Sequence, residues 1–172
     1  MQNVYLVGFM GAGKTAVGQV LAGRLDRVFF DMDKAIEARA GMPISEIFAT
    51  RGEAAFRMAE DDEVEMTTDR KGLVVATGGG AFTSRRNRQL IHGSGGVSVF
   101  LDPPWETIRR RLAGATSSRP KWVDDVQARG LYDARMPTYL MATVHIDLAG
   151  DEDPNETADR IVDALEEITC GS

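Results

Sequence analysis

Short apolar runs alternate with amphipathic helical patterns along the whole chain. The runs expected to form buried strands are 4–7, 27–30, 73–76 and 97–101, with a weaker one at 143–147. Between them, apolar residues recur at helical spacing, as at Val17, Leu21 and Leu25 after the first run. No repeat, low-complexity tract or shift in composition divides the sequence, so we expect one domain over residues 1–172.

The alternation of strands and helices predicts an α/β fold. Strands joined by helical crossovers run parallel and are buried on both sides, so we expect a five-stranded parallel sheet flanked by helices on both faces. Ligands of such sheets bind beyond the carboxyl ends of the strands. Polar or Gly-rich clusters follow Val7, Phe30 and Ala76, and we expect these clusters to converge on one crevice.

Capping and breaking residues place further helices. The predicted segments are one that begins near Ile36 and ends at Gly41, a short one at 43–48 and a longer one that Gly52 opens. The C-terminal helix is well marked, because Asp153 can cap it and Pro154 suits its first turn.

Composition narrows the partners and the compartment. The 172 residues are 43% hydrophobic and carry a net charge of -6, which argues against general binding of nucleic acid or anionic membranes. No apolar stretch approaches the ~20 residues of a membrane span, and no secretory leader pattern is visible. The single cysteine, Cys170, forms no intramolecular disulfide. We expect a cytoplasmic protein, and a monomer, because no surplus apolar helix face is evident.

The segment GFMGAGKT, residues 8–15, has the phosphate-loop pattern. Its glycines let backbone N–H groups turn toward phosphate oxygens, while Lys14 reaches the terminal phosphates and the Thr15 hydroxyl ligates Mg²⁺. An ordinary Gly-rich turn is the alternative, but the flanking strand and helix patterns disfavour it. The expected nucleotide contacts here are Gly11, Ala12, Gly13, Lys14, Thr15 and Ala16.

Two carboxylates follow the second predicted strand. A strand-like continuation would aim Asp31 and Asp33 to the same side, near the phosphate loop. One can then hold Mg²⁺, and the other can orient a hydroxyl or accept its proton during transfer. The alternative is that the pair only caps a helix beginning near Lys34.

Two motifs suit an acceptor pocket. Arg57 and Glu60 lie three residues apart on a predicted helix, and an arginine held in this way can capture a carboxylate with two hydrogen bonds. A solvated surface pair is the alternative. Gly78, Gly79 and Gly80 follow a strand and allow close backbone approach, unless they form only a flexible loop.

Positive charge is concentrated at 109–111 and again at 119–121, around the small polar segment 114–118. This composition suits a mobile lid, about residues 112–124, that carries Arg119 onto the transferring phosphates. A solvated loop is the alternative.

Later residues give weaker signals. Arg135 could supply a second contact to an anion. His92 and His145 have no paired ligand spacing, so no zinc site is predicted, and we interpret His145 as structural.

In this order and spacing, the segments GFMGAGKT, DMD, GMPISEIF, GEAAFRMAE and TGGGA resemble the shikimate kinases over nearly the whole chain. The resemblance implies a P-loop fold like that of nucleoside-monophosphate kinases, with a mobile lid. It also implies transfer of the ATP γ-phosphate, with Mg²⁺, to the 3-hydroxyl of shikimate in aromatic amino-acid biosynthesis. The alternatives are a related small-molecule kinase, such as a gluconate kinase, and a nucleotide-binding module without catalysis. Asp33, Arg57 and the glycine triplet favour shikimate.

The resemblance also implies roles for single residues. The implied catalytic residues are Lys14, Asp33 and Arg119, with Asp33 orienting the shikimate hydroxyl and a candidate base. The implied ATP and metal contacts beyond Lys14 are Thr15, Asp31, Arg119, Pro154 and one arginine of 109–111, which we take to be Arg111. The implied substrate contacts are Asp33, Arg57, Gly78, Gly79, Gly80 and Arg135.

The chain departs from the family pattern at two places. Lys121 and Trp122 follow Pro120 where two leucines are usual, and Thr138 precedes Tyr139 where a leucine is usual. These differences concern the packing of the lid and the turnover more than the identity of the substrate.

Overall fold

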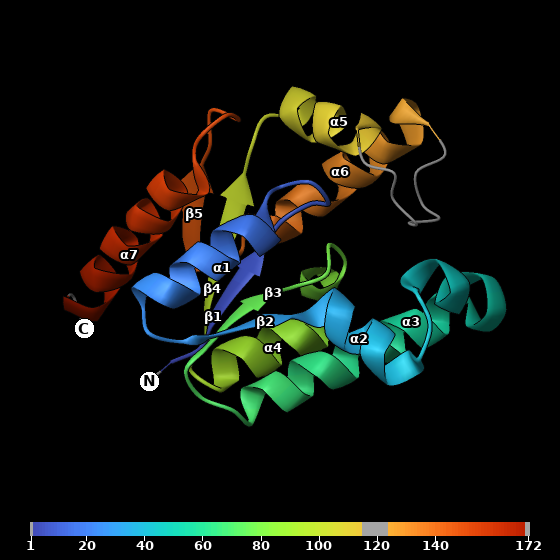
Figure 1. Cartoon of the computed structure of the whole chain (residues 1–172), viewed down its shortest axis with the longest axis horizontal. Helices are drawn as coiled ribbons and strands as arrows, with labels where there is room; N and C mark the ends of the chain where they lie inside the picture. The colour runs from blue at the N-terminus through green and yellow to red at the C-terminus, as the bar shows by residue number, and fades with distance from the viewer. Residues whose placement is uncertain (1, 115–123, 171–172) are drawn as a thin grey trace.

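The computed structural model describes residues 2–114 and 124–170, in which five strands alternate with helices (Figure 1). The strands are β1 (Val4–Val7), β2 (Val28–Asp31), β3 (Leu73–Ala76), β4 (Val97–Asp102) and β5 (Val144–Asp147). The α-helices are α1 (Lys14–Arg24), α2 (Met32–Ala40), α3 (Ile44–Thr68), α4 (Arg85–Gly93), α5 (Trp105–Ala113), α6 (Asp125–Tyr139) and α7 (Pro154–Cys170), and η1 (Ala81–Thr83) is a short 3₁₀ helix. None of these described helices is long and apolar enough to cross a membrane.

The five strands form one parallel sheet in the order β2-β3-β1-β4-β5. In this register Leu6 of β1 lies between Ala76 of β3 and Val99 of β4. The predicted parallel five-stranded sheet is therefore confirmed. Because every strand runs the same way, the loops that follow β1, β2 and β3 all leave the sheet at the carboxyl ends of its strands.

Helices cover both faces of the sheet, and β1 shows why its sequence is apolar throughout. Val4 and Leu6 face the core shared with α1 and α7, whereas Tyr5 and Val7 face the core shared with α3, α4 and α6. All four side chains are at most 1% exposed. A strand buried on both faces has no polar side, which explains the continuous apolar run.

A smaller lobe projects beyond the sheet where α2 and the first half of α3 pack together (Figure 1). Its core contains Ile36, Ile44, Ile47 and Phe56. Gly52 (φ 81°, ψ 171°) breaks the helical geometry inside α3, so the prediction of a short helix followed by a longer one from Gly52 is confirmed.

The boundaries of α2 were predicted only in part. Gly41 (φ 69°) ends the helix as expected, because glycine adopts the left-handed conformation readily. The expected start near Ile36 is wrong, since α2 begins at Met32 directly after β2. The first turn holds one core residue, Met32, which is fully buried, next to Asp33, which lines the cavities, so no helical apolar repeat marks this start.

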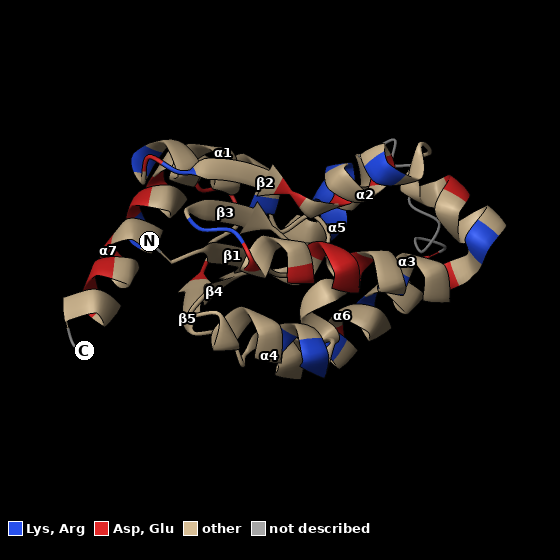
Figure 2. Ribbon diagram, turned by 90° about the horizontal axis from the view of Figure 1, so that it is seen from below, with Lys and Arg blue, Asp and Glu red and all other residues tan. Residues whose placement is uncertain are grey.

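Charge is unevenly distributed over the helices. Asp and Glu residues recur along α7 and along the second half of α3, while Lys and Arg residues are more dispersed (Figure 2). The net charge of -6 thus resides largely on the outer helices. A site for an anionic ligand must be built from arginine and lysine side chains held locally, as the composition predicts.

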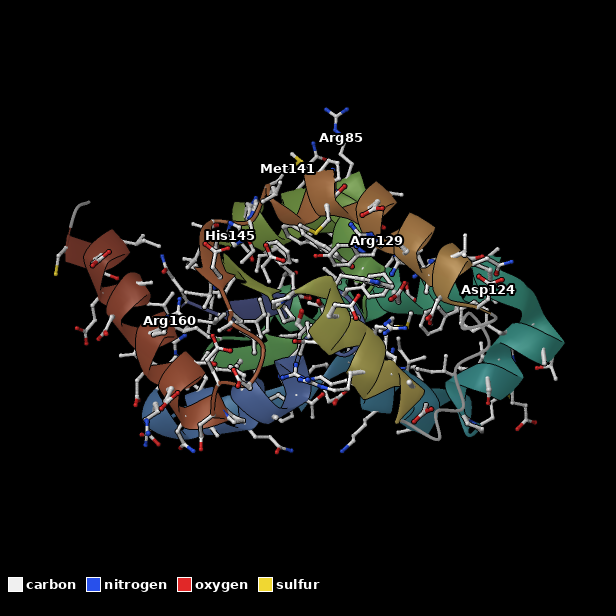
Figure 3. All side chains as sticks on the ribbon, turned by 90° about the horizontal axis from the view of Figure 1, so that it is seen from above. Arg85, Asp124, Arg129, Met141, His145 and Arg160 are labelled. Carbon is white, nitrogen blue, oxygen red and sulfur yellow. The ribbon has the colours of Figure 1, made fainter. Side chains whose placement is uncertain are left out.

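Helix α6 leads back toward β5 and carries side chains into the centre of the molecule. Asp124 caps its beginning by accepting a hydrogen bond from the Gln127 N–H (2.7 Å), and Met141 lies just beyond its end, with Arg129 between them (Figure 3). The Arg129 guanidinium lies over the Trp105 ring, 5.5 Å from its centre, and so links α6 to α5.

Candidate active site

The loop between β1 and α1 has a backbone that requires glycine. Gly8, Gly11 and Gly13 have φ angles of 144°, 77° and 97°, a region that other residues rarely adopt. A Cβ atom on Gly8 would also lie 2.8 Å from the carbonyl oxygen of Leu101. The glycines are therefore needed to turn this loop around the amino end of α1, where N–H groups and the helix dipole favour an anion.

Lys14 and Thr15, the first residues of α1, form the floor of this loop. The Lys14 ammonium donates to the carbonyl oxygens of Gly8 (2.7 Å) and Phe9 (2.9 Å), and so spans the loop. The Thr15 hydroxyl donates to Oδ2 of Asp31 at 3.2 Å. Thr15 and Asp31 are hard-oxygen ligands of the kind that Mg²⁺ prefers, so the residues present fit the expected magnesium site.

The strand-like continuation predicted for Asp31 and Asp33 is wrong. Asp31 ends β2 and caps α2, because its Oδ1 accepts the Lys34 N–H at 3.2 Å, and Asp33 lies in the first turn of the helix. Asp31 therefore does cap a helix, although capping is not its only contact, because its Oδ2 accepts from the Thr15 hydroxyl. Both aspartates nevertheless line the cavity beside the phosphate loop, together with Lys14 and Thr15. The helix start, rather than strand alternation, brings the two carboxylates to this cavity.

A second cavity adjoins the first and opens to solvent. It is lined by Met10, Asp33, Ile44, Phe48, Phe56, Arg57, Glu60, Gly79, Gly80 and Arg135. Met10, Asp33 and Gly79 line both cavities. A group bound in the second cavity can therefore lie beside a phosphate held in the first, with Asp33 at the boundary.

Arg57 is fixed in the second cavity by two carboxylates. Its Nη1 donates to Glu60, and its Nη2 donates to Oε1 of Glu53 at 3.2 Å. Glu60 is only 1% exposed. The alternative that Arg57 and Glu60 form a solvated surface pair is therefore wrong. Burial lowers the pKa of Arg57, but the ion pairs with Glu60 and Glu53 outweigh burial and leave that pKa raised. The guanidinium consequently remains charged and oriented.

Arg135 reaches the same cavity from α6. It is buried, its guanidinium lies 5.7 Å from the centre of the Phe9 ring, and the cavity wall includes its side chain. One helical turn later, the Tyr139 hydroxyl donates to the carbonyl oxygen of Gly79. Burial raises the pKa of Tyr139 to about 12, so this hydroxyl stays protonated and holds the glycine loop against α6.

The glycine triplet allows the close approach that the sequence predicted. A Cβ atom on Gly78 would lie 2.4 Å from Oε1 of Glu60, and a Cβ on Gly80 would overlap the Arg57 guanidinium. A Cβ on Gly79 would lie 3.3 Å from Nη1 of Arg135. All three glycines are buried, so the triplet packs against the charged wall of the cavity and the flexible-loop alternative is disfavoured.

The structure distinguishes among the arginines of α5. Arg111 donates to the carbonyl oxygens of Gly11 and Gly150, both at 3.0 Å, and so joins the phosphate loop to the segment before α7. Arg109 instead pairs with Glu106 and Asp125. Of these two, Arg111 lies beside the nucleotide loop. Pro154 begins α7, four residues after Gly150.

Several predicted features lie outside the described residues. They are Arg119, the two residues that differ from the family pattern at Lys121 and Trp122, and most of the expected lid.

Sequence reasoning also missed residues that complete the cavity walls. Met10 and Phe48 line the second cavity, and Tyr139 supports Gly79. The spacing of Tyr139, four residues after Arg135 and therefore on the same helix face, is the signal that could have indicated its role. Met10 and Phe48 carry no such signal, because apolar residues in a loop and in a short helix are common.

Comparison with known proteins gives consistent results. Residues 10–166 match the family model described as shikimate kinase. The chain is 43% identical to the shikimate kinase of Halorhodospira halophila over 95% of this chain and 93% of that protein. It is 39% identical to the shikimate kinase of Nostoc punctiforme over 96% and 92%. The solved structure of shikimate kinase from Acinetobacter baumannii in complex with shikimate is 36% identical, with a TM-score of 0.91, and the match covers 97% of this chain and 94% of that one.

Proposed function

The chain belongs to the shikimate kinase family, and we propose that its two adjoining cavities hold MgATP and shikimate for direct phosphoryl transfer. The transfer moves the γ-phosphate of ATP to the 3-hydroxyl of shikimate and yields ADP and shikimate 3-phosphate. The observation that carries this assignment is the pair of cavities that meet at Met10, Asp33 and Gly79. Lys14 and Thr15 lie on one side of this boundary, and Arg57 and Arg135 lie on the other.

On the donor side, the backbone of residues 11–16 and the amino end of α1 bind the phosphates. Lys14 exchanges its carbonyl partners in the loop for phosphate oxygens, and Thr15 and Asp31 hold the metal ion. When bound, Mg²⁺ supplies neutralisation of the charge on the β- and γ-phosphates. Arg111 and the Pro154 region lie on the adenine side, because Arg111 contacts both Gly11 and Gly150.

On the acceptor side, Arg57 and Arg135 bind the carboxylate of shikimate through charge-assisted hydrogen bonds. The Gly78–Gly80 backbone lies along the ring of the substrate. Asp33, which lines both cavities, orients the 3-hydroxyl toward the phosphate and accepts its proton as the new P–O bond forms. Catalysis is then chiefly positioning and charge neutralisation.

We extend the proposal to the arrangement of the whole chain. Residues 1–172 act as one kinase domain with a lid at about 112–124, from which Arg119 reaches the transferring phosphates. The protein works as a monomer in the cytoplasm, where ATP is available and a lone cysteine such as Cys170 stays reduced. Light scattering measures the mass of the purified protein in solution. The mass of a dimer would contradict the proposal that the protein is a monomer.

The decisive experiment is an ADP-release assay with MgATP and one acceptor at a time. Shikimate is expected to support release, whereas gluconate and nucleoside monophosphates are not. Gluconate is an open chain that does not hold a hydroxyl at a fixed position relative to its carboxylate, and nucleoside monophosphates carry no carboxylate for the paired arginines. Release with gluconate but not with shikimate would assign the site to a different small-molecule kinase. Nucleotide binding without release for any acceptor would identify a binding module.

A further inference from the structure

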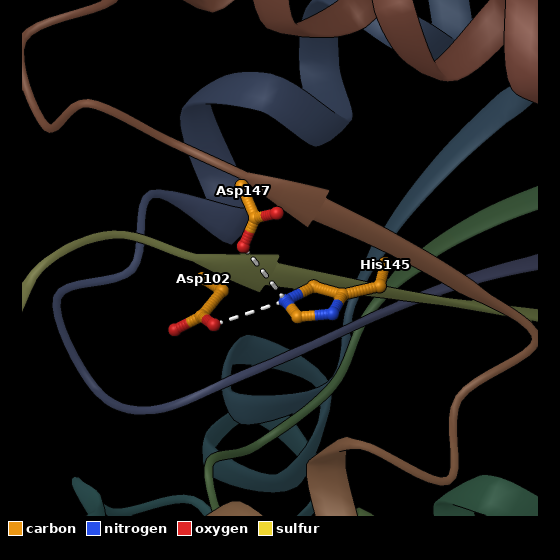
Figure 4. Close-up of side chains that lie close together, drawn as sticks. All are labelled: Asp102, His145 and Asp147. Atoms are coloured by element: carbon orange, nitrogen blue, oxygen red, sulfur yellow. Dashed lines mark hydrogen bonds and ion pairs between the residues drawn. The ribbon is translucent and has the colours of Figure 1, made fainter.

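A histidine and two aspartates meet at the carboxyl ends of β4 and β5 (Figure 4). The Nε2 atom of His145 lies 2.9 Å from Oδ2 of Asp102 and 3.2 Å from Oδ1 of Asp147. One ligand atom from each side chain lies within 4.8 Å of the other two. No sequence pattern indicates this group, because Asp102 is more than 40 residues away from the other two members.

The parallel pairing of two strands fixes this arrangement. Asp102 is opposite Asp147 in the β4–β5 register, and Phe100 is opposite His145. His145 and Asp147 are two residues apart in β5 and therefore point to the same face, while Val144 and Ile146 are buried on the other. The His145 ring also stacks on Phe100, with centroids 5.0 Å apart at 24°. Rigid backbone and ring stacking thus hold the donor atoms together.

One nitrogen cannot satisfy both carboxylates as a hydrogen-bond donor. Nε2 carries at most one hydrogen, and that hydrogen points at one acceptor or is shared weakly between two. A bound cation can contact both carboxylate oxygens and the nitrogen at full strength. Two carboxylates and a neutral imidazole also balance a divalent charge, provided that Nδ1 of His145 carries the ring hydrogen.

The spacing of the donor atoms fits a coordination shell. Bonds from zinc-like metals to imidazole nitrogen and carboxylate oxygen are about 2.0–2.2 Å, so adjacent ligand atoms lie roughly 3.0–3.5 Å apart. The measured separations from Nε2, 2.9 and 3.2 Å, are close to this range. The other oxygen of Asp102 accepts from the Tyr132 hydroxyl at 3.5 Å, a contact of the kind that orients a metal ligand from outside.

We propose that Asp102, His145 and Asp147 form a site for a divalent transition metal of the zinc or cobalt class, separate from the Mg²⁺ that accompanies ATP. Imidazole favours such metals over Mg²⁺, which prefers oxygen ligands and water. The two sites are built on different strands, because Asp31 ends the edge strand β2, whereas Asp102 ends β4 and Asp147 ends β5, the other edge strand. Asp147 has an 86% exposed side chain, which leaves room for water to complete the shell and gives reversible binding.

The bound metal joins the last two strands to each other. Through the Tyr132 contact it also supports α6, the helix that brings Arg135 and Tyr139 to the acceptor cavity. The site is therefore a structural one for the half of the sheet on which α6 packs. The metal site takes no part in the kinase reaction. A negative zinc titration and a negative ADP-release assay are therefore separate results.

The test is calorimetric titration of Zn²⁺ into metal-free full-length protein in excess Mg²⁺, which occupies sites made of oxygen ligands alone. Cys170→Ser serves as the parent, so that the exposed thiol cannot bind zinc. One zinc is expected to bind, and His145→Asn and Asp147→Asn are each expected to weaken binding at least about tenfold. Asp151→Asn, a nearby exposed aspartate outside the cluster, is the matched control and should bind as the parent does.

Cobalt gives an independent measurement, because its visible absorption reports nitrogen and oxygen coordination. The parent should show a saturable Co²⁺ spectrum that Zn²⁺ displaces and that His145→Asn lacks. Circular dichroism confirms that each variant is folded, and Asp147→Asn retains the test if His145→Asn unfolds. Equal zinc affinity in the parent and both variants would overturn the proposal. A parent protein that binds no zinc once excess Mg²⁺ is present would also overturn it.

Discussion

At the scale of single residues, the site depends on charged groups whose positions are set by buried partners. Arg57 is oriented by Glu60, which is 1% exposed, and Asp33 is fixed in the first turn of α2. Both residue types and spacings were visible in the sequence. Which side of each residue faces solvent was not visible, because exposure depends on the packing of α3 against the Gly78–Gly80 loop.

Replacement of Asp33 tests its role in proton transfer. Asp33→Asn is nearly isosteric but removes the base, so kcat is expected to fall by about 10²-fold or more while ATP affinity changes little. Steady-state kinetics and ATP titration measure the two effects, with exposed Asp69→Asn as the matched control. An unchanged kcat would remove Asp33 from the reaction.

Replacement of Arg57 tests recognition of the carboxylate. Arg57→Ala removes a charge-assisted bond worth about 1.5–3 kcal/mol, so the KM for shikimate should rise roughly 10- to 150-fold, with a much smaller change for ATP. Arg51→Ala, an exposed arginine earlier in α3, is the control. Because Glu60 loses its partner in Arg57→Ala, Arg57→Lys is measured alongside to keep the charge. Equal increases in both KM values would contradict the assignment.

At the scale of elements, helix α6 and the loop after β3 form one unit although they are 60 residues apart. The sequence indicated a helix before Arg135 and a glycine triplet after a strand. It did not show that Tyr139 joins them, since a tyrosine late in a helix more often packs in a core. The connection exists because α6 packs against η1, which directly follows the glycine triplet.

Tyr139→Phe tests this connection. The substitution leaves the Gly79 carbonyl without its buried donor, which is expected to cost about 1–3 kcal/mol of unfolding free energy and to raise the KM for shikimate. Urea unfolding and steady-state kinetics are the measurements. Tyr132→Phe loses only a 3.5 Å contact to Asp102 and should cost less. A larger loss in Tyr132→Phe than in Tyr139→Phe would show that the Gly79 contact is unimportant.

At the scale of the whole molecule, an acidic protein binds anions by enclosing a few arginines in buried surroundings. The same burial affects Glu63, whose side chain is 1% exposed and pairs with Arg39 at 3.0 Å, while neither carboxylate oxygen has a hydrogen-bond donor of good geometry. Burial raises the pKa of Glu63 above its ordinary value, although Arg39 acts in the opposite direction.

The raised pKa predicts how stability depends on pH. Between the ordinary glutamate value, about 4.3, and the raised pKa of Glu63, the folded state binds more protons than the unfolded state. The free energy of unfolding contributed by Glu63 therefore falls as pH rises through this range. Glu63→Gln should raise Tm at neutral pH, and the gain should disappear below the range. Thermal unfolding from pH 4 to 8, with exposed Glu65→Gln as control, measures the effect. A gain that is equal at all pH values would exclude Glu63 as its source.

The sequence by itself determined the alternation of strands and helices, the phosphate loop and the types of the charged residues that line the two cavities. These follow from local rules, namely hydrophobic periodicity, glycine conformation and the ligand chemistry of lysine, threonine and aspartate. Only the tertiary structure decided that Arg111 lies beside the phosphate loop, that Glu60 is buried and that Asp102 joins His145 and Asp147. Each of these depends on strand order and helix packing, which bring together residues far apart in the chain. Lys14 and Thr15 could thus be placed in a phosphate loop from eight consecutive residues, whereas the second cavity required the fold.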